Sequence, residues 1–226
     1  MNISGPGLVC AATLQELQTF GLQNAEPIES DKLWRIPEGY AAVTGAGIPI
    51  AMLRLIPWIQ SLKPAWIVNI GIAGAYPESH LEISDVVVGT SEVFADLGME
   101  MPDEEGFRPL SAFPFADPLL RSPLPLWIPE WITGAKQGRG ATVNRCTGKD
   151  GTGWLRRKIF ATDFESMEGA AVALAARELK IPVCEIRAIS NLAAKRDMRP
   201  ENIQIALSSL KTFWEIHRNK LGNPLS

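Results

Sequence analysis

Short apolar runs alternate along the chain with segments in which apolar residues recur every three or four positions. Apolar runs bounded by glycine are typical of buried strands, and the recurring spacing is typical of amphipathic helices. We expect strands at Leu8–Thr13, Tyr40–Gly47 up to its glycine turn, Ala65–Ile70, Ile83–Val88 with a continuation toward Ser91–Phe94, Gly140–Thr147, Ala161–Glu165 and Ile181–Ser190. We expect helices at Leu14–Phe20, Ile48–Leu62, Thr152–Phe160, Ser166–Leu179 and Pro200–Asn219.

This alternation predicts the fold class. It indicates an α/β fold with a single domain, built as three α/β/α layers around a mixed, largely parallel central sheet. No internal repeat or low-complexity linker divides residues 1–226, so we expect one domain. Residues 99–138 are rich in proline and aromatic residues and lack periodicity, which predicts an irregular loop region. Its tryptophans, Trp127 and Trp131, favour packing or a subunit interface over disorder.

Charge and targeting signals narrow the class of protein. A net charge of -3 and a pI near 5.5 argue against a nucleic-acid partner, which needs a clustered basic surface. Arg156, Arg157 and Lys158 do cluster, but we interpret them as the solvated face of a helix. No apolar run reaches the length of a membrane span, and the N-terminus lacks the pattern of a signal peptide. We therefore expect a cytoplasmic protein with no membrane partner.

The cysteine and histidine content excludes several chemistries. The three cysteines are an odd number and lie far apart, which gives no disulfide framework and fits reduced cytoplasmic thiols. The two histidines, His80 and His217, are too few for a His-rich metal site and nearly exclude a Ser-His-Asp or Cys-His triad. We expect neither a metal nor a cofactor.

Ligands of largely parallel sheets bind at the carboxyl ends of strands, here after Cys10, Ile70, Thr142 and Ile189. The candidate side chains at and near these ends are each open to two interpretations. The glycines in 71–75 let a backbone approach either a ligand or a neighbouring strand.

Glu168, at the start of an alanine-rich helix, can cap that helix or grip a vicinal diol. Asn191 is either a turn residue or a ligand-binding one. Arg187 lies inside an apolar run and must be paired, with Glu168 a plausible partner. The spacing alone does not select Glu16, which fits a surface position on the first turn of a helix.

Taken together, these segments resemble the superfamily of purine nucleoside and uridine phosphorylases. Within it they are similar to the nucleosidase branch, and most similar to the futalosine hydrolases. The stretches that carry the resemblance are CAATLQEL, VNIGIAGA, the run from Ile83 through SEVFADLG, FESMEGAA, and IRAISN with the following KRD. FESMEGAA combined with RAISN is specific, whereas the glycine-rich segment is only supportive, and residues 99–138 match poorly. The resemblance implies a phosphorylase/nucleosidase-like fold and a homodimer or larger homo-oligomer.

The resemblance also implies roles for individual residues. Glu16 stands where the related nucleosidases have the glutamate that activates water. Met167 and Glu168 match the pair that binds the ribose hydroxyls, and Asn191 matches an aspartate that protonates an adenine leaving group. The other substrate-binding residues implied are Thr13, Ala73, Gly74, Thr147 and Gly148, with Arg196 as the candidate partner of a substrate carboxylate. Asp96 in FADLG matches the family as well, in either a structural or a functional role.

Two departures from the family pattern refine this picture. An asparagine offers both a donor and an acceptor, so Asn191 suits a 6-oxopurine such as hypoxanthine rather than adenine. Phosphorylases carry arginine and a hydroxyl residue in the VNIGIAGA region, where this chain has Asn69 and Ile72. A phosphate would be poorly stabilised without them, which favours water as the nucleophile.

The implied activity is hydrolysis of the N-ribosidic bond of futalosine, a nucleoside that carries a benzoate. The products are hypoxanthine and dehypoxanthine futalosine, in a step of menaquinone biosynthesis. Two alternatives stay open. The first is a purine nucleosidase or phosphorylase for other nucleosides, and the second is a non-catalytic relative that binds nucleosides.

Overall fold

The computed structural model describes residues 5–102, 106–195 and 199–221, and its strands and helices alternate along the chain. The strands are β1 (Gly7–Ala11), β2 (Glu26–Glu29), β3 (Leu33–Ile36), β4 (Gly39–Val43), β5 (Trp66–Ala75), β6 (Val86–Phe94), β7 (Gly98–Glu100), β8 (Phe107–Pro109), β9 (Leu124–Pro125), β10 (Lys136–Thr142), β11 (Phe164–Ser166) and β12 (Val183–Leu192). The helices are α1 (Leu14–Phe20), α2 (Ile48–Leu62), α3 (Asp150–Phe160), α4 (Gly169–Glu178) and α5 (Pro200–His217).

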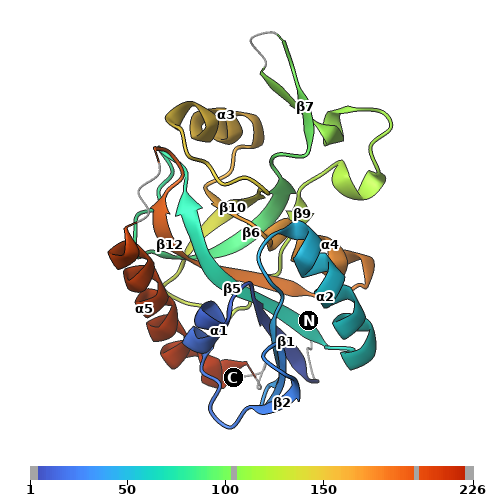
Figure 1. Cartoon of the computed structure of the whole chain (residues 1–226), viewed down its shortest axis with the longest axis vertical. Helices are drawn as coiled ribbons and strands as arrows, with labels where there is room; N and C mark the ends of the chain where they lie inside the picture. Colours follow the sequence, from blue (N-terminus) through green and yellow to red (C-terminus); the bar gives the residue numbers. More distant parts are fainter. Residues whose placement is uncertain (1–4, 103–105, 196–198, 222–226) are drawn as a thin grey trace.

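The central sheet has the strand order β11-β10-β6-β12-β5-β1-β4-β3-β2 (Figure 1). Strand β1 runs parallel to β4 and β5, and β12 runs parallel to β5. The pairs β12–β6, β3–β4 and β2–β3 are antiparallel, so the sheet is mixed. Strand β11 pairs with both β10 and β5, which closes one end of the sheet on itself. Closure brings the ends of β5, β10, β11 and β12 close together.

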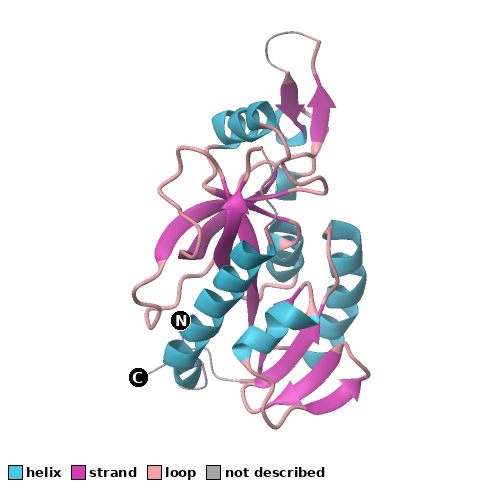
Figure 2. Ribbon diagram, turned by 60° about the vertical axis from the view of Figure 1, so that its left-hand side comes forward, coloured by secondary structure: helices cyan, strands magenta, loops and turns pink. Residues whose placement is uncertain are grey.

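Helices cover both faces of this sheet (Figures 1 and 2). Helices α1 and α5 pack on one face, over a core that includes Leu17, Leu210 and Trp214. Helices α2 and α4 pack on the other face, where Leu55 and the alanines of α4 are buried. Alanine has no side chain beyond Cβ, so α4 can lie close to the strands beneath it. The expected three-layer α/β fold with a mixed sheet is confirmed.

Several element boundaries differ from the expectation. Residues Gly71–Ala75 extend β5 beyond its expected end at Ile70, because β12 pairs with them along their length and β11 pairs with Gly74 and Ala75. The strand expected at Gly140–Thr147 is displaced to Lys136–Thr142. The hairpin of β2 and β3 was not expected, since each strand has only four residues, too few to show a clear alternation.

The region 99–138 contains more structure than the sequence indicated. Strands β7 and β8 form a separate hairpin at the end of the molecule shown at the top of Figure 2, and β9 pairs with β6. Trp131 packs 6.5 Å from Trp214, and Trp127 contacts the same core. Of the two interpretations of these tryptophans, packing within the chain is therefore the one the structure supports. Among the described residues, no helix has the length and apolar character needed to cross a bilayer.

Candidate active site

The four strand ends selected from the sequence meet at one cavity of about 320 Å³. Residues that follow β1 and β10, the distal half of β5 and the end of β12 all contribute to its wall, together with the segment that joins β11 to α4. The lining residues are Ala12, Thr13, Gln15, Glu16, Ala46, Ile72, Ala73, Gly74, Cys146, Thr147, Glu165, Ser166, Met167, Glu168, Ser190, Asn191, Ile203 and Leu207.

Glu16 is held in place by the first turn of α1. Thr13 caps the helix, because its hydroxyl accepts from the Glu16 N–H at 3.2 Å. In return, Glu16 Oε2 accepts from the Thr13 N–H at 3.0 Å and from the Thr13 hydroxyl at 2.7 Å. Glu16 Oε1 accepts from the Ile72 N–H of β5 at 3.0 Å. This reciprocal capping box buries a carboxylate that its spacing alone had suggested to be a surface group.

Glu168 occupies the N-cap position of α4 but does not cap it. Its side chain makes no cap hydrogen bond, and Oε1 instead accepts from the Gly47 N–H at 2.8 Å. Gly47 has a φ of 87°, a conformation that glycine adopts without strain. The expected pairing with Arg187 is confirmed, with Nη1 lying 3.8 Å from Glu168 Oε2. Of the two interpretations, the capping one is therefore wrong.

A close approach at Gly71 brings Arg187 and Glu16 together. A Cβ at Gly71 would collide with Arg187 Nη1 and would lie 2.6 Å from Glu16 Oε1. Burial alone would lower the pKa of Arg187, but the carboxylates of Glu185, Glu168 and Glu16 raise it, so the guanidinium is charged. Any residue larger than glycine at position 71 would push the Arg187 guanidinium and the Glu16 carboxylate apart.

Asn191 lies at the end of β12, on the cavity wall. Its Oδ1 accepts from the Ser190 hydroxyl at 3.0 Å, and its Nδ2 donates to the Leu192 carbonyl at 2.9 Å. An amide has two donor hydrogens and two oxygen lone pairs, so one of each is left for a ligand. The residue is therefore more than a turn former.

Thr147 is positioned by a buried ionic network that the sequence did not reveal. Glu165 accepts from the Thr147 N–H at 2.7 Å, from its hydroxyl at 2.6 Å and from the Tyr76 hydroxyl at 3.0 Å. Arg156 Nη1 lies 3.2 Å from Glu165 Oε2. The interpretation of Arg156 as part of a solvated face is wrong, because α3 turns this side chain inward against Glu165.

The remaining candidates lie in different places. Ala73, Gly74 and Met167 line the cavity, and Gly148 is not among its lining residues. Arg196 lies outside the described residues. Asp96 accepts from the Asn144 and Arg145 N–H groups, at 2.6 and 3.2 Å, and so orders the loop that follows β10. In the described part of the chain, no group of three His, Cys, Asp or Glu side chains is placed to hold a metal ion.

The family comparison agrees with this geometry. Residues 38–215 match the family model described as the phosphorylase superfamily. The chain belongs to the phosphorylase superfamily. A futalosine hydrolase of Thermus thermophilus is 30% identical over 193 residues, which cover 78% of this chain and 81% of the relative. A futalosine hydrolase of Streptomyces coelicolor is 35% identical over 147 residues, which cover 64% of this chain and 61% of the relative.

Solved structures of the superfamily share the fold. A mutant nucleosidase of Helicobacter pylori, crystallised with 5'-methylthioadenosine in its active site, superposes with a TM-score of 0.77 at 18% identity, covering 96% of this chain and 99% of that one. At this identity the likeness establishes the fold alone. This chain spans less than two thirds of the length of the Streptomyces relative.

Proposed function

We propose that this chain hydrolyses the N-ribosidic bond of futalosine, releasing hypoxanthine and dehypoxanthine futalosine, in menaquinone biosynthesis. One observation carries the proposal: Glu16, Glu168 and Asn191 line the same cavity. Main-chain N–H groups of other segments orient both carboxylates, Ile72 for Glu16 and Gly47 for Glu168. The futalosine hydrolases among the relatives support the choice of substrate.

The three side chains divide the work of the reaction. The bond to the base loosens first and leaves an oxocarbenium-like sugar. Glu168 binds the 2'- and 3'-hydroxyls, and its negative charge stabilises the cationic sugar. Glu16 accepts a proton from the attacking water. Asn191 donates to the 6-oxo group of the departing hypoxanthine and, once N7 has taken a proton from solvent, accepts from the N7–H.

The charges around the cavity support water over phosphate as the nucleophile. Arg187 is the cation beside Glu16 and Glu168, and Glu185 is its third carboxylate neighbour. Three carboxylates around one guanidinium leave a net negative charge that repels phosphate. Ile72 adds no hydroxyl, and Asn69 is buried in β5, where its Nδ2 lies 3.4 Å from Glu185.

Product analysis tests the proposed reaction. The purified chain is incubated with futalosine and with inosine, each with and without phosphate, and the products are separated by mass spectrometry. We expect hypoxanthine and dehypoxanthine futalosine at a rate that phosphate does not change. A sugar 1-phosphate would mean a phosphorylase, and no base release from any nucleoside would mean a non-catalytic binding protein.

A second candidate is hydrolysis of an adenine nucleoside, favoured by a relative of Arabidopsis thaliana, a 5'-methylthioadenosine nucleosidase that is 32% identical over 152 residues. Asn191 separates the two candidates. Asn191→Asp removes the amide donor and places acceptor oxygens opposite the 6-oxo group. We expect kcat/KM for futalosine to fall about 10²-fold, and kcat/KM for 6-amino-deoxyfutalosine to fall less. The exposed Asn219→Asp is the control, and an equal loss on both substrates would contradict the role given to Asn191.

The pH dependence tests the charge state of Glu168. Burial raises its pKa above the ordinary value of 4.5, although Arg187 and the Gly47 N–H oppose the rise. Glu168 must be ionised to stabilise a cationic sugar, and a raised pKa means that it takes up a proton earlier as the pH falls. We therefore expect the acid limb of kcat/KM to have its midpoint above the ordinary glutamate value. A midpoint at or below that value would assign the limb to another group.

We also propose that residues 1–226 act as one cytoplasmic nucleoside phosphorylase-like domain that assembles into a homodimer or larger homo-oligomer. Apolar Ile50 and Leu53 support this assembly, because they are exposed on α2 close to Gly47, the residue that holds Glu168. Light scattering of the purified chain across a range of concentrations distinguishes an oligomer from a monomer.

A further inference from the structure

Two buried carboxyl groups lie on neighbouring strands outside the cavity lining. Glu92 on β6 is 0% exposed and Glu185 on β12 is 1% exposed. Both approach the first residue of α4: a Cβ at Gly169 would lie 2.5 Å from Glu92 Oε1 and 2.6 Å from Glu185 Oε1. Two carboxylates this close cannot both ionise without strong repulsion in a dry interior.

The hydrogen-bond partners of the pair leave room for one proton. Glu92 Oε2 accepts from the Thr142 hydroxyl at 2.7 Å, and that hydroxyl accepts from the Ala170 N–H of α4 at 2.6 Å. Glu92 Oε1 and Glu185 Oε2 have no donor among the described residues. Burial and the neighbouring Glu185 carboxylate raise the pKa of Glu92 well above its usual range. A proton on Glu92 would supply the missing hydrogen bond between the two groups.

Glu185, the second carboxyl group of the pair, connects to the active site through Arg187. Glu185 Oε1 accepts from Arg187 Nε at 2.8 Å, and Arg187 Nη1 lies 3.8 Å from Glu168 Oε2. The guanidinium is thus held on its Nε side by Glu185 and faces Glu168 with Nη1. The shorter of the two contacts is the one to Glu185, so Glu185 sets how closely the cation approaches Glu168.

We propose that Glu92 and Glu185 share one proton, and that Glu185 is a positioning residue that holds Arg187 at a set distance from Glu168. The consequence for substrate binding rests on the function proposed above. If Glu185 releases Arg187, the guanidinium pairs more tightly with Glu168 and competes with the ribose hydroxyls for it. The inference itself concerns a proton and a side-chain position, which can be measured without substrate.

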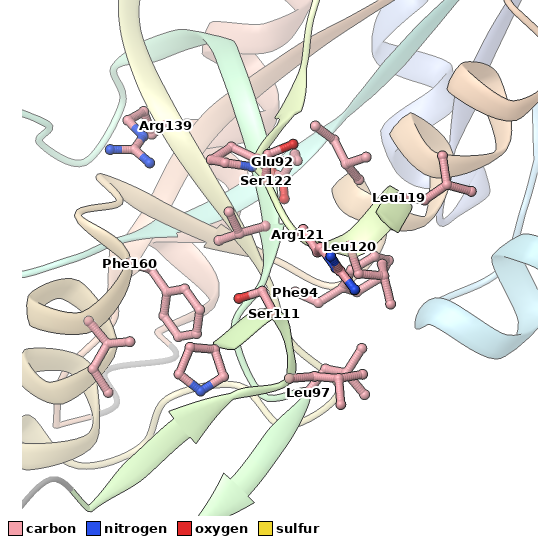
Figure 3. A pocket seen from close by; sticks show the side chains of 16 residues that line it. Glu92, Phe94, Leu97, Ser111, Leu119, Leu120, Arg121, Ser122, Arg139 and Phe160 are labelled. Carbon is pink, nitrogen blue, oxygen red and sulfur yellow. The ribbon is translucent and has the colours of Figure 1, made fainter. Parts of the chain in front are cut away.

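On its other side Glu92 borders a second cavity, which is lined by both apolar and polar residues. Figure 3 labels Glu92 among the residues of a second cavity of about 200 Å³, with Phe94, Leu120 and Phe160. Arg121 and Arg139 are the cationic residues of that lining, and the Arg121 guanidinium donates to the Ala116 and Pro114 carbonyls. Neither arginine has an ion pair with Glu92 among the described contacts. The charged group that acts most strongly on the Glu92 carboxyl is therefore Glu185, which is itself an acid.

Infrared spectroscopy tests the shared proton directly. We expect wild-type protein at neutral pH to show the carbonyl band of a neutral carboxylic acid, and we expect this band to be absent from Glu92→Gln and present in Glu168→Gln. Glutamine is the matched replacement, since its oxygen can accept from Thr142 while its amide donates to Glu185. Absence of the band in wild type, or its persistence in Glu92→Gln, would overturn the shared proton.

Crystal structures of two Glu185 variants test the positioning role. In Glu185→Gln the side chain that holds Arg187 loses its charge, and Arg187 should move closer to Glu168 than 3.8 Å. In Glu185→Asp this side chain keeps its charge but is shorter, so Arg187 should move away from Glu168. Glu92→Gln should leave the distance unchanged. An unmoved Arg187 in the variants of Glu185 that fold would overturn the role.

Kinetics then separate this inference from the proposed function. We expect Glu185→Gln to raise KM for futalosine about tenfold or more with kcat changed less, and Glu92→Gln to keep both near the wild-type values. A uniform loss of kcat at constant KM would contradict competition for Glu168. If wild-type protein releases no hypoxanthine, the proposed function fails, while the infrared band and the Arg187 distances still decide this inference.

Discussion

Glu168→Gln is expected to lower kcat/KM for futalosine about 10²–10³-fold, the usual cost of losing one electrostatic contact to a transition state. The substitution keeps the size of the side chain, and the amide oxygen can still accept from the Gly47 N–H. What it removes is the negative charge that faces the cationic sugar, and one of the two acceptors for the ribose hydroxyls. Glu168→Ala removes both acceptors and should be nearly inactive. Steady-state kinetics with futalosine measure both effects.

The control for Glu168 is the same exchange at an exposed site. Glu215→Gln on α5 breaks only a solvent-exposed pair with Lys211, and we expect its activity to match the wild type. A circular-dichroism spectrum and a melting curve show that each variant is folded. Near-wild-type turnover in Glu168→Gln would remove Glu168 from the mechanism and leave its burial to be explained by the contacts to Gly47 and Arg187 alone.

Glu16→Gln is the second change with a large expected effect, again about 10²–10³-fold in kcat. A glutamine cannot take a proton from water, so the step that makes the nucleophile is lost. KM should change less than kcat, because the ribose contacts of Glu168 remain. Incorporation of ¹⁸O from labelled water into the sugar product confirms that the residual reaction is still hydrolysis.

Glu16→Gln also weakens the capping box, and this second effect must be separated from the first. Losing the reciprocal contacts with Thr13 should cost about 0.5–2 kcal/mol of stability, measured as a change in the urea midpoint. Activity is therefore compared at a temperature where both proteins are folded. The exposed Glu26→Gln is the control. A loss of activity that disappears under these conditions would reduce Glu16 to a structural role.

Local patterns were enough to predict the main elements. The periodicity of α2 predicted its limits at Ile48 and Leu62, and the apolar run Ile181–Ser190 was recognised as a buried strand, which the structure places at Val183–Leu192. The strand expected at Ala65–Ile70 was too short at its carboxyl end, because glycines such as Gly71 and Gly74 are typical of turns. Only pairing with β12 and β11 keeps that segment extended, and pairing is a long-range property.

The sequence also predicted the residues that line the cavity better than the buried charged residues around them. The strand-end rule and the family resemblance led to Glu16, Glu168 and Asn191, and all three line the cavity. Glu165, Glu92 and Glu185 gave no such signal. Their partners lie on other elements: Arg156 of α3 for Glu165, and Glu92 of β6 and Glu185 of β12 for each other.

The sequence by itself determined the fold class, the strand ends that meet at the cavity and the types of side chain available there. These follow from local periodicity and from motifs a few residues long. The tertiary structure decided which groups are charged, paired and aligned. Whether Glu168 caps its helix or faces the cavity depends on the N–H of Gly47, 121 residues away. Burial and pairing across the sheet fix such properties, and no local pattern encodes the distance between two strands.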